Sequence, residues 1–141
     1  CDLIIASVTA RFGLPEVSRG LIAASGGAAI LPLRVPPQIA RELICTGALI
    51  DGQRAFEVGL ANKVVAPEEL DAAAFGMANT IAENSPLAVQ ESLGIARMAT
   101  EADVDKLLLL SDHAYRRVEE GDDFTEGPRA FLEKRKPNWK T

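Results

Sequence analysis

One carboxylate in this sequence stands where it could act as a general acid or base. Glu16 directly follows Pro15, whose ring fixes its own φ and keeps the preceding Leu14 extended. We therefore expect Glu16 in a stiff loop segment rather than in the middle of a helix. The small-residue stretch 20–27 follows closely and lets a backbone approach a ligand. A carboxylate held there could move a proton to or from a substrate; a surface glutamate in a turn is the alternative interpretation.

The glycines of that stretch also allow two interpretations. Gly20, Gly26 and Gly27 could cradle an anion at the start of a helix, or they could serve only tight packing. Their spacing matches neither the G-x-G-x-x-G fingerprint nor the P-loop, which favours the packing role.

The remaining nucleophilic and metal-ligating residue types favour structural roles. His113 is the only histidine and lies in a leucine-rich segment, which predicts a surface or interface position. Cys45 is expected in the middle of a helix, where its apolar neighbours indicate an inert packing role. Ser25 lacks the histidine partner that nucleophilic catalysis needs. Cys1 and Cys45 have no metal-ligand spacing to each other or to His113, so no metal site is predicted.

The elements that would hold Glu16 are short. Apolar and β-branched residues predict a buried strand over 2–6 and a second extended piece over 9–13. Ser25 is expected to cap a short helix over 26–31, which Pro32 stops.

A longer helix is predicted over 37–46, where Gly47 ends it. The residues expected on its apolar side are Ile39, Ala40, Leu43 and Ile44. Asp51 is expected to cap another short helix that runs through Val58, and residues 60–65 are predicted to form a strand.

Residues 67–141 predict helices only. Pro67 and two glutamates suit a helix start, and Asn84-Ser85-Pro86 begins a second helix that reaches about residue 99. An apolar stripe on the first of these helices is formed by Leu70, Ala74, Met77 and Ile81. Thr100 and Asp103 resemble a capping box before a third helix. Its leucines 107–110 predict burial on two sides, at a subunit interface. A last helix is expected over 125–134.

Composition restricts the class of protein. The 141 residues are 48% hydrophobic and 25% charged, which is typical of a globular domain and excludes disorder and a disulfide scaffold. No apolar run reaches the ~18 residues of a membrane span. The net charge of −5 argues against a nucleic-acid-binding face. The first residues carry no signal peptide, and the two distant cysteines are expected to stay reduced, so a cytoplasmic location is predicted.

The two ends of the chain add two hypotheses. Residues 129–141 hold five Lys or Arg against one Glu, which indicates a local anionic partner or a solvated terminus. The chain starts without Met on an apolar strand, so we expect it to be the C-terminal part of a longer protein.

Several motifs together resemble the second half of the enoyl-CoA hydratase/isomerase (crotonase) superfamily. They are Cys1-Asp2-Leu3-Ile4-Ile5-Ala6, Ala10-Arg11-Phe12-Gly13-Leu14-Pro15-Glu16, Gly20-Leu21-Ile22-Ala23-Ala24-Ser25-Gly26-Gly27, Thr46-Gly47, Ala55, Gly59-Leu60-Ala61-Asn62-Lys63-Val64-Val65, Asn84-Ser85-Pro86 and the stretch 126–137. Each motif is weak alone, but the combination covers essentially the whole chain and is specific at superfamily level.

The resemblance implies an α/β fold of crotonase type. Residues 1–66 would be the C-terminal part of its ββα spiral, and residues 67–141 a helical region that drives assembly into a homotrimer or a dimer of trimers, so that this chain is mostly α. The substrate implied is an acyl-CoA thioester, with coenzyme A as part of the substrate and no separate cofactor. Neither nucleic acid nor a membrane is implied as a partner.

Four positions carry the site that the resemblance implies. Glu16 matches the second of two glutamates that hold a water in family hydratases, and it needs apolar neighbours such as Leu14 or Ile22 to withdraw it from bulk water. Ala24 stands at a backbone N–H that helps to place the water, where typical hydratases have Gly. Phe131 and Lys134 match positions that contact the adenine and a phosphate of CoA.

Three functions stay open. The favoured function is addition of water across the 2,3 double bond of a 2-enoyl-CoA. The second is Δ3,Δ2-enoyl-CoA isomerisation, and the third is a non-catalytic oligomerisation or RNA-binding module. The first catalytic glutamate and the oxyanion-hole donors of the family lie outside this sequence. Loss of one such donor costs about 2.7–4 kcal/mol of barrier, so we expect the 141-residue chain alone to show no measurable hydration.

Overall fold

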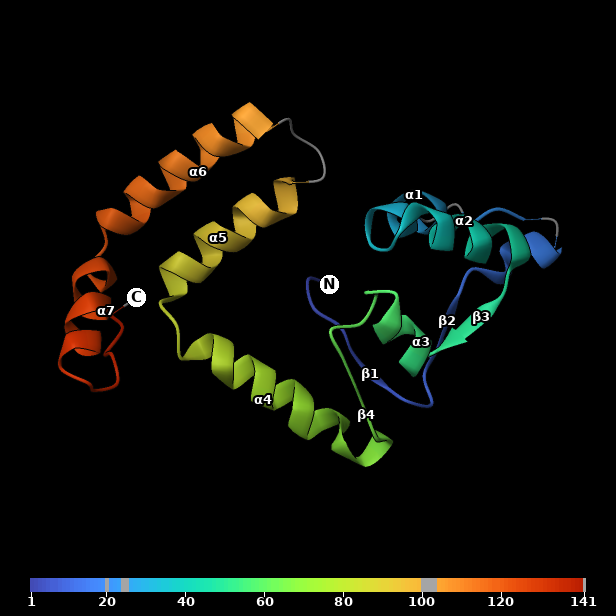
Figure 1. Ribbon diagram of the computed structural model, residues 1–141, viewed down its shortest axis with the longest axis horizontal. Helices are drawn as coiled ribbons and strands as arrows, with labels where there is room; N and C mark the ends of the chain where they lie inside the picture. Colours follow the sequence, from blue (N-terminus) through green and yellow to red (C-terminus); the bar gives the residue numbers. More distant parts are fainter. Residues whose placement is uncertain (20, 24–25, 100–103, 141) are drawn as a thin grey trace. The chain divides into compact units, whose positions relative to one another are not determined.

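The computed structural model describes residues 1–19, 21–23, 26–99 and 104–140, and within 104–111 it describes only the side chain of Leu109. The chain forms two compact units, Cys1–Gly76 and Met77–Thr141, and each is described by itself. Figure 1 labels the helices and strands of both units. Helical residues outnumber strand residues, as the sequence predicts.

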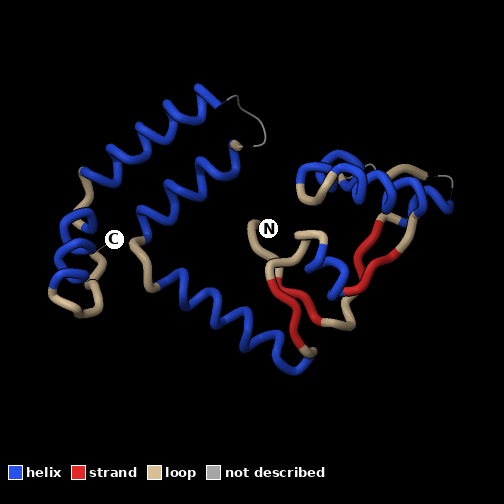
Figure 2. The backbone as a smooth tube through the Cα atoms, in the orientation of Figure 1, coloured by secondary structure: helices blue, strands red, loops and turns tan. Residues whose placement is uncertain are grey.

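Four short strands lie in the described part of the first unit, in two pairs (Figure 2). They are β1 (Ile5–Ser7), β2 (Arg11–Gly13), β3 (Leu49–Asp51) and β4 (Lys63–Val65). β1 pairs with β4 in parallel, and β2 pairs with β3 antiparallel. Asn62 extends the parallel pair, because its Oδ1 accepts from the N–H of Ile4 at 2.8 Å and its own N–H donates to the Ile4 carbonyl at 2.7 Å.

Short helices follow the strands in the first unit. They are the 3-10 helices η1 (Pro15–Arg19), η2 (Leu31–Leu33) and η3 (Pro67–Glu69), and the α-helices α1 (Gly27–Ile30), α2 (Pro37–Thr46) and α3 (Gly52–Glu57). α4 (Leu70–Ala82) contains the boundary between the units. The second unit continues with α5 (Pro86–Met98), α6 (Val104–Glu119) and α7 (Asp123–Leu132).

The core of the first unit is made of small side chains. Its two buried clusters are Ala6, Ala55 and Ala61, and Val35, Ala40 and Val58. Ile50 and Leu60 pack against both clusters. Large apolar side chains that stay exposed in this unit include Leu21, Ile22, Ile30, Leu33 and Leu49. The first unit therefore leaves much of its large apolar surface uncovered.

The predicted helix end at Gly47 and the predicted helix starts at Asp51 and Ser85 are confirmed. α2 ends at Gly47, which takes the left-handed conformation that glycine favours, and Ala40 and Leu43 are buried on its apolar side. Asp51 caps α3, because its Oδ1 accepts from the N–H of Arg54 at 2.8 Å. Ser85 caps α5 by accepting from the N–H of Ala88 at 3.4 Å.

Other expectations are wrong in detail. Glu16 lies in a 3-10 helix rather than in a loop, and Pro32 lies within η2 instead of ending the helical segment. β3 was not predicted, because Leu49 and Ile50 form too short an apolar run to stand out from sequence. On α4, Ala74 and Ile81 of the predicted apolar stripe are exposed. The predicted capping residues Ser25, Thr100 and Asp103 lie outside the described residues, and so do the side chains of Leu107, Leu108 and Leu110.

Within the described residues, no helix combines the length and the apolar character that a membrane crossing requires.

Candidate active site

Glu16 is held by a rigid, internally bonded turn. It is the second residue of η1, which Pro15 begins after the short stretch that leaves β2. The hydroxyl of Ser18 donates to the Pro15 carbonyl at 2.7 Å, and the N–H of Leu21 donates to the Glu16 carbonyl at 3.1 Å. These bonds fix the backbone on both sides of the Glu16 side chain.

The C-terminal end of α2 supports this turn from one side. Gly47 has a φ of 66°, and a Cβ added to it would lie 3.4 Å from the Cα of Pro15 and 3.3 Å from Cγ2 of Val17. A side chain here would therefore combine backbone strain with crowding against η1. The close approach of α2 to η1 depends on this glycine.

One carboxylate oxygen of Glu16 is buried and has no hydrogen-bond partner among the described residues. Leaving a buried polar group unsatisfied costs about 1–3 kcal/mol, so native structures rarely do this without a reason. Glu16 thus does not point into bulk solvent, as a surface glutamate in a turn would.

The glycine pair lies beside the residue that precedes this turn. Gly26 has a φ of 94° and stands at the start of α1. A Cβ added to Gly27 would lie 2.7 Å from Cδ2 of Leu14 and 3.1 Å from Cβ of Ala23. The structure therefore brings together the glycine pair and the segment that leads into Glu16. Tight packing is the role it shows for Gly27.

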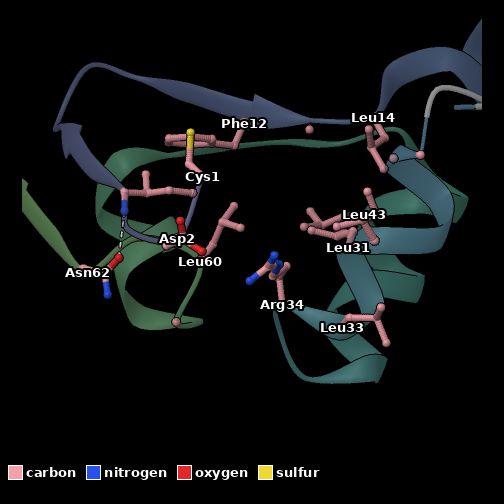
Figure 3. Close-up of a pocket in the computed structure, with 16 residues that line it drawn as sticks. Cys1, Asp2, Phe12, Leu14, Leu31, Leu33, Arg34, Leu43, Leu60 and Asn62 are labelled. Atoms are coloured by element: carbon pink, nitrogen blue, oxygen red, sulfur yellow. Dashed lines mark hydrogen bonds between the residues drawn. The ribbon is translucent and has the colours of Figure 1, made fainter. Parts of the chain in front are cut away.

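A cavity of about 750 Å³ opens next to this segment. It is lined by Leu14, Gly26 and Gly27 together with residues from the strands and from α2, and Glu16 is not one of the residues that line it. In Figure 3, Leu14, Leu31 and Leu43 lie on one side of the cavity, Phe12 and Leu60 lie on the other, and Arg34 reaches between them. Its walls suit an apolar group, with the Arg34 guanidinium as a cation.

The other predicted site residues near Glu16 are placed less favourably. Ala24 lies outside the described residues, so its predicted role remains a prediction. Ile22 is 71% exposed and does not bury the carboxylate, which leaves Leu14 as the half-buried apolar neighbour in sequence.

The predicted CoA-contacting residues lie in the second unit, at the end of α7. Phe131 is 83% exposed, and Lys134 follows the helix with a φ of 54°. Sequence reasoning missed the groups that surround them. Arg135 donates two hydrogen bonds to Glu126, at 2.6 and 3.0 Å. These bonds, followed by one from the N–H of Asn138, lower the pKa of Glu126 to about 2.

The remaining candidate residues lie at exposed positions and form no reactive cluster among the described residues. His113 is exposed on α6. Cys1 and Cys45 are free and exposed, so the expectation that Cys45 is packed inside its helix is wrong. Among the described residues, no three His, Cys, Asp or Glu side chains gather where they could hold a metal ion.

The comparisons with known proteins agree with one another. Residues 1–141 match the family described as enoyl-CoA hydratase/isomerase. Carnitinyl-CoA dehydratase of Proteus mirabilis is 41% identical over 143 residues, which cover 99% of this chain and 55% of that protein. Crotonyl-CoA hydratase of Syntrophomonas wolfei is 39% identical over 139 residues, which cover 99% and 54%.

Solved structures give the same result. Enoyl-CoA hydratase from Mycobacterium tuberculosis matches with a TM-score of 0.94 at 38% identity, over 99% of this chain and 56% of that one. Enoyl-CoA hydratase from Bacillus anthracis matches with a TM-score of 0.96 at 36% identity, over 99% and 54%. The chain thus spans about half the length of the relatives that it matches.

Proposed function

The chain belongs to the enoyl-CoA hydratase/isomerase family and has its crotonase-like fold, and we propose that it serves a hydro-lyase that adds water across the 2,3 double bond of a 2-enoyl-CoA. In this proposal Glu16 is a catalytic residue. The oxygen of water bonds to C3 of the acyl chain and keeps one proton as the new hydroxyl group, while the π bond breaks and a proton is added to C2. Glu16 takes the proton that the water releases or supplies the proton that C2 gains.

The observation that carries the proposal is the buried, unpartnered oxygen of Glu16. In the whole protein, a water brought to this carboxylate beside the substrate would satisfy the unpartnered oxygen and would be oriented for attack. The bonded turn of η1 supports this role, because a fixed carboxylate loses little freedom when it engages a reacting group.

The names of the relatives support a hydro-lyase rather than an isomerase. Carnitinyl-CoA dehydratase, crotonyl-CoA hydratase and the short-chain-enoyl-CoA hydratase of Clostridium acetobutylicum are all named for the gain or loss of water on a CoA thioester. We propose an acyl-CoA thioester as the substrate of this chain also, with no further cofactor.

The rest of the catalytic apparatus is proposed to lie outside residues 1–141. Hydration needs a second group to share the water and N–H donors to polarise the thioester carbonyl. The relatives are about twice as long as this chain, which leaves room for both. A homotrimer or a dimer of trimers is proposed as the assembly.

The test is to offer the natural protein that carries this chain two substrates, crotonyl-CoA and a 3-enoyl-CoA. The proposal predicts conversion of crotonyl-CoA into 3-hydroxybutyryl-CoA. Conversion of the 3-enoyl-CoA into the 2-enoyl-CoA without any hydration would replace the proposal with an isomerase. Inertness toward both substrates would favour a non-catalytic member of the family.

A further inference from the structure

One cation of the basic tail differs from its neighbours. Arg129 and Arg135 pair with Glu133, Lys136 with Glu83 at 3.7 Å, and Lys140 with Asp122 at 3.6 Å. Lys134 lies among them but makes no ion pair with any residue that the structure describes. Its ammonium group is therefore the one cation of this tail with no carboxylate beside it among the residues that the structure describes.

The backbone of Lys134 is also unusual. It is the one residue other than glycine with a positive φ in the described part of the chain, at 54°. Its N–H donates to the Phe131 carbonyl at 3.2 Å, and the N–H of Arg135 donates to the Ala130 carbonyl at 3.1 Å. This pair of bonds is the Schellman motif, whose left-handed position is usually occupied by glycine. A lysine kept there against the backbone preference points to a use for its side chain.

A clamp of charged side chains holds that turn. Arg135 donates through Nη1 and Nη2 to the two carboxylate oxygens of Glu126, and through Nε to Glu133 at 2.6 Å. Bidentate, charge-assisted pairs of this kind are strong and directional. The Glu126 side chain is only 18% exposed and also accepts from the N–H of Asn138 at 2.7 Å. Glu126 and Arg135 thus fix the chain on both sides of the turn at Lys134.

The segment after the turn, residues 135–140, is bound back onto the second unit, and we call it the C-terminal strap. The indole N–H of Trp139 donates to the Glu83 carbonyl at 2.6 Å. The N–H of Lys140 donates to buried Asp123 at 3.0 Å, and Asp123 in turn accepts from Ser85 at 2.9 Å. The strap therefore limits the directions that Lys134 can take.

We propose that Arg135 is a positioning residue, whose clamp with Glu126 fixes the left-handed turn that presents the Lys134 ammonium group to a phosphate of coenzyme A. This inference rests on the proposed acyl-CoA substrate. Arg135 itself is unsuited to bind the phosphate, since two carboxylates surround its guanidinium group and occupy Nε, Nη1 and Nη2.

The test measures affinity for coenzyme A and for pantetheine, which lacks the nucleotide phosphates, by calorimetry on the natural full-length protein. Lys134→Ala and Arg135→Gln should each weaken coenzyme A binding by about tenfold and leave pantetheine binding unchanged. The double variant should bind no more weakly than Lys134→Ala alone, because Arg135 acts through Lys134. Lys136→Ala, which removes a paired lysine two residues away, is the matched control and should stay within about twofold.

Other results would overturn the inference. Unchanged coenzyme A affinity in Arg135→Gln would do so. Losses of affinity that multiply in the double variant would also do so, because they would mean that Arg135 binds the phosphate directly. Equal affinities of the unaltered protein for coenzyme A and pantetheine would also exclude a phosphate contact. Hydration of crotonyl-CoA by that same protein would still support the proposed function, so the proposed function and the positioning role of Arg135 can fail separately.

A second variant separates positioning from folding. Glu126→Gln keeps the size of the side chain and an acceptor for Asn138 but removes the ionic clamp. The emission of Trp139, the only tryptophan, reports whether the strap stays docked. Loss of coenzyme A affinity with unaltered emission would support the inference; wild-type affinity in Glu126→Gln would contradict it.

Discussion

At the scale of single residues, two atoms distinguish this chain from an ordinary half-buried surface. One is the buried Glu16 oxygen and the other is the ammonium group of Lys134 on a left-handed backbone, and neither has a partner among the residues that the structure describes. The buried oxygen and the left-handed backbone oppose the stability of the chain, and the carboxylate and the ammonium group become useful once a ligand is present.

The backbone at Lys134 makes a stability prediction. A left-handed conformation costs an L-residue about 1–2 kcal/mol, and glycine adopts it freely. Lys134→Gly should therefore raise the free energy of unfolding by about 1 kcal/mol in urea titrations. Lys136→Gly is the matched control, since its φ is not positive, and it should give no gain. A Lys134→Gly protein less stable than the Lys136→Gly protein would contradict the strain.

The clamp also makes a pH prediction. The pKa of Glu126 is lowered to about 2, first by the hydrogen bonds from Arg135 and then by the N–H of Asn138. Because the folded pKa lies below the unfolded value of about 4.3, this contribution to stability is complete above the unfolded value and is lost as the pH falls toward 2. The emission of Trp139 should stay constant down to about pH 5 and shift to the red below it.

The control for that titration is Glu126→Gln, which has no carboxylate to protonate at this position. Its acid transition should have a smaller amplitude than that of the unaltered chain. Glu133, whose pKa Arg135 also lowers, accounts for part of the remaining transition. Identical transitions in the two proteins would mean that Glu126 does not hold the strap.

At the scale of elements, caps and turns make the sharpest predictions. The Asp51 side chain caps α3 and lies 3.9 Å from Arg11 of the neighbouring strand. Asp51→Ala should cost about 1 kcal/mol of unfolding free energy, because the N–H of Arg54 loses its acceptor. Asp51→Asn keeps an equally good cap and should be nearly neutral in the same denaturation experiment. Equal losses in both variants would assign the effect to the charge rather than to the cap.

The sequence predicted the elements that are fixed by neighbouring residues. Gly47 ended α2 and Asp51 began α3 as expected, since both signals act over a few residues. β3 escaped prediction because its strand character comes from pairing with β2, more than thirty residues earlier in the chain.

The site was predictable to a similar extent. Pro15 and the glycines drew attention to Glu16, but only the fold shows that one of its oxygens is buried without a partner. The pair of Glu126 and Arg135 was not foreseen, because Glu126 lies in the first turn of α7 whereas Arg135 lies beyond its C-terminal end, and the two meet only after the turn at Lys134.

At the scale of the whole molecule, exposed apolar side chains predict association. Phe131 and Leu132 are 83% and 79% exposed at the end of α7, and Leu109 is exposed on α6. Large apolar side chains left exposed on these two helices offer surface that a second copy of the chain could cover. We expect light scattering on the 141-residue chain at micromolar concentration to give a mass above that of the monomer, as the proposed trimer requires. A monomer alone would contradict that assembly.

The proposed hydration depends on one carboxylate, and its most direct test compares the turnover number for crotonyl-CoA between two variants of the natural protein. Glu16→Gln removes the proposed proton carrier, whereas Glu42→Gln changes an exposed glutamate of α2 in the same way. Since a positioned acid or base contributes about 10²–10⁴-fold to a rate, the account predicts that Glu16→Gln hydrates at least a hundredfold more slowly than Glu42→Gln. Turnover of the two variants within about twofold of each other would contradict it.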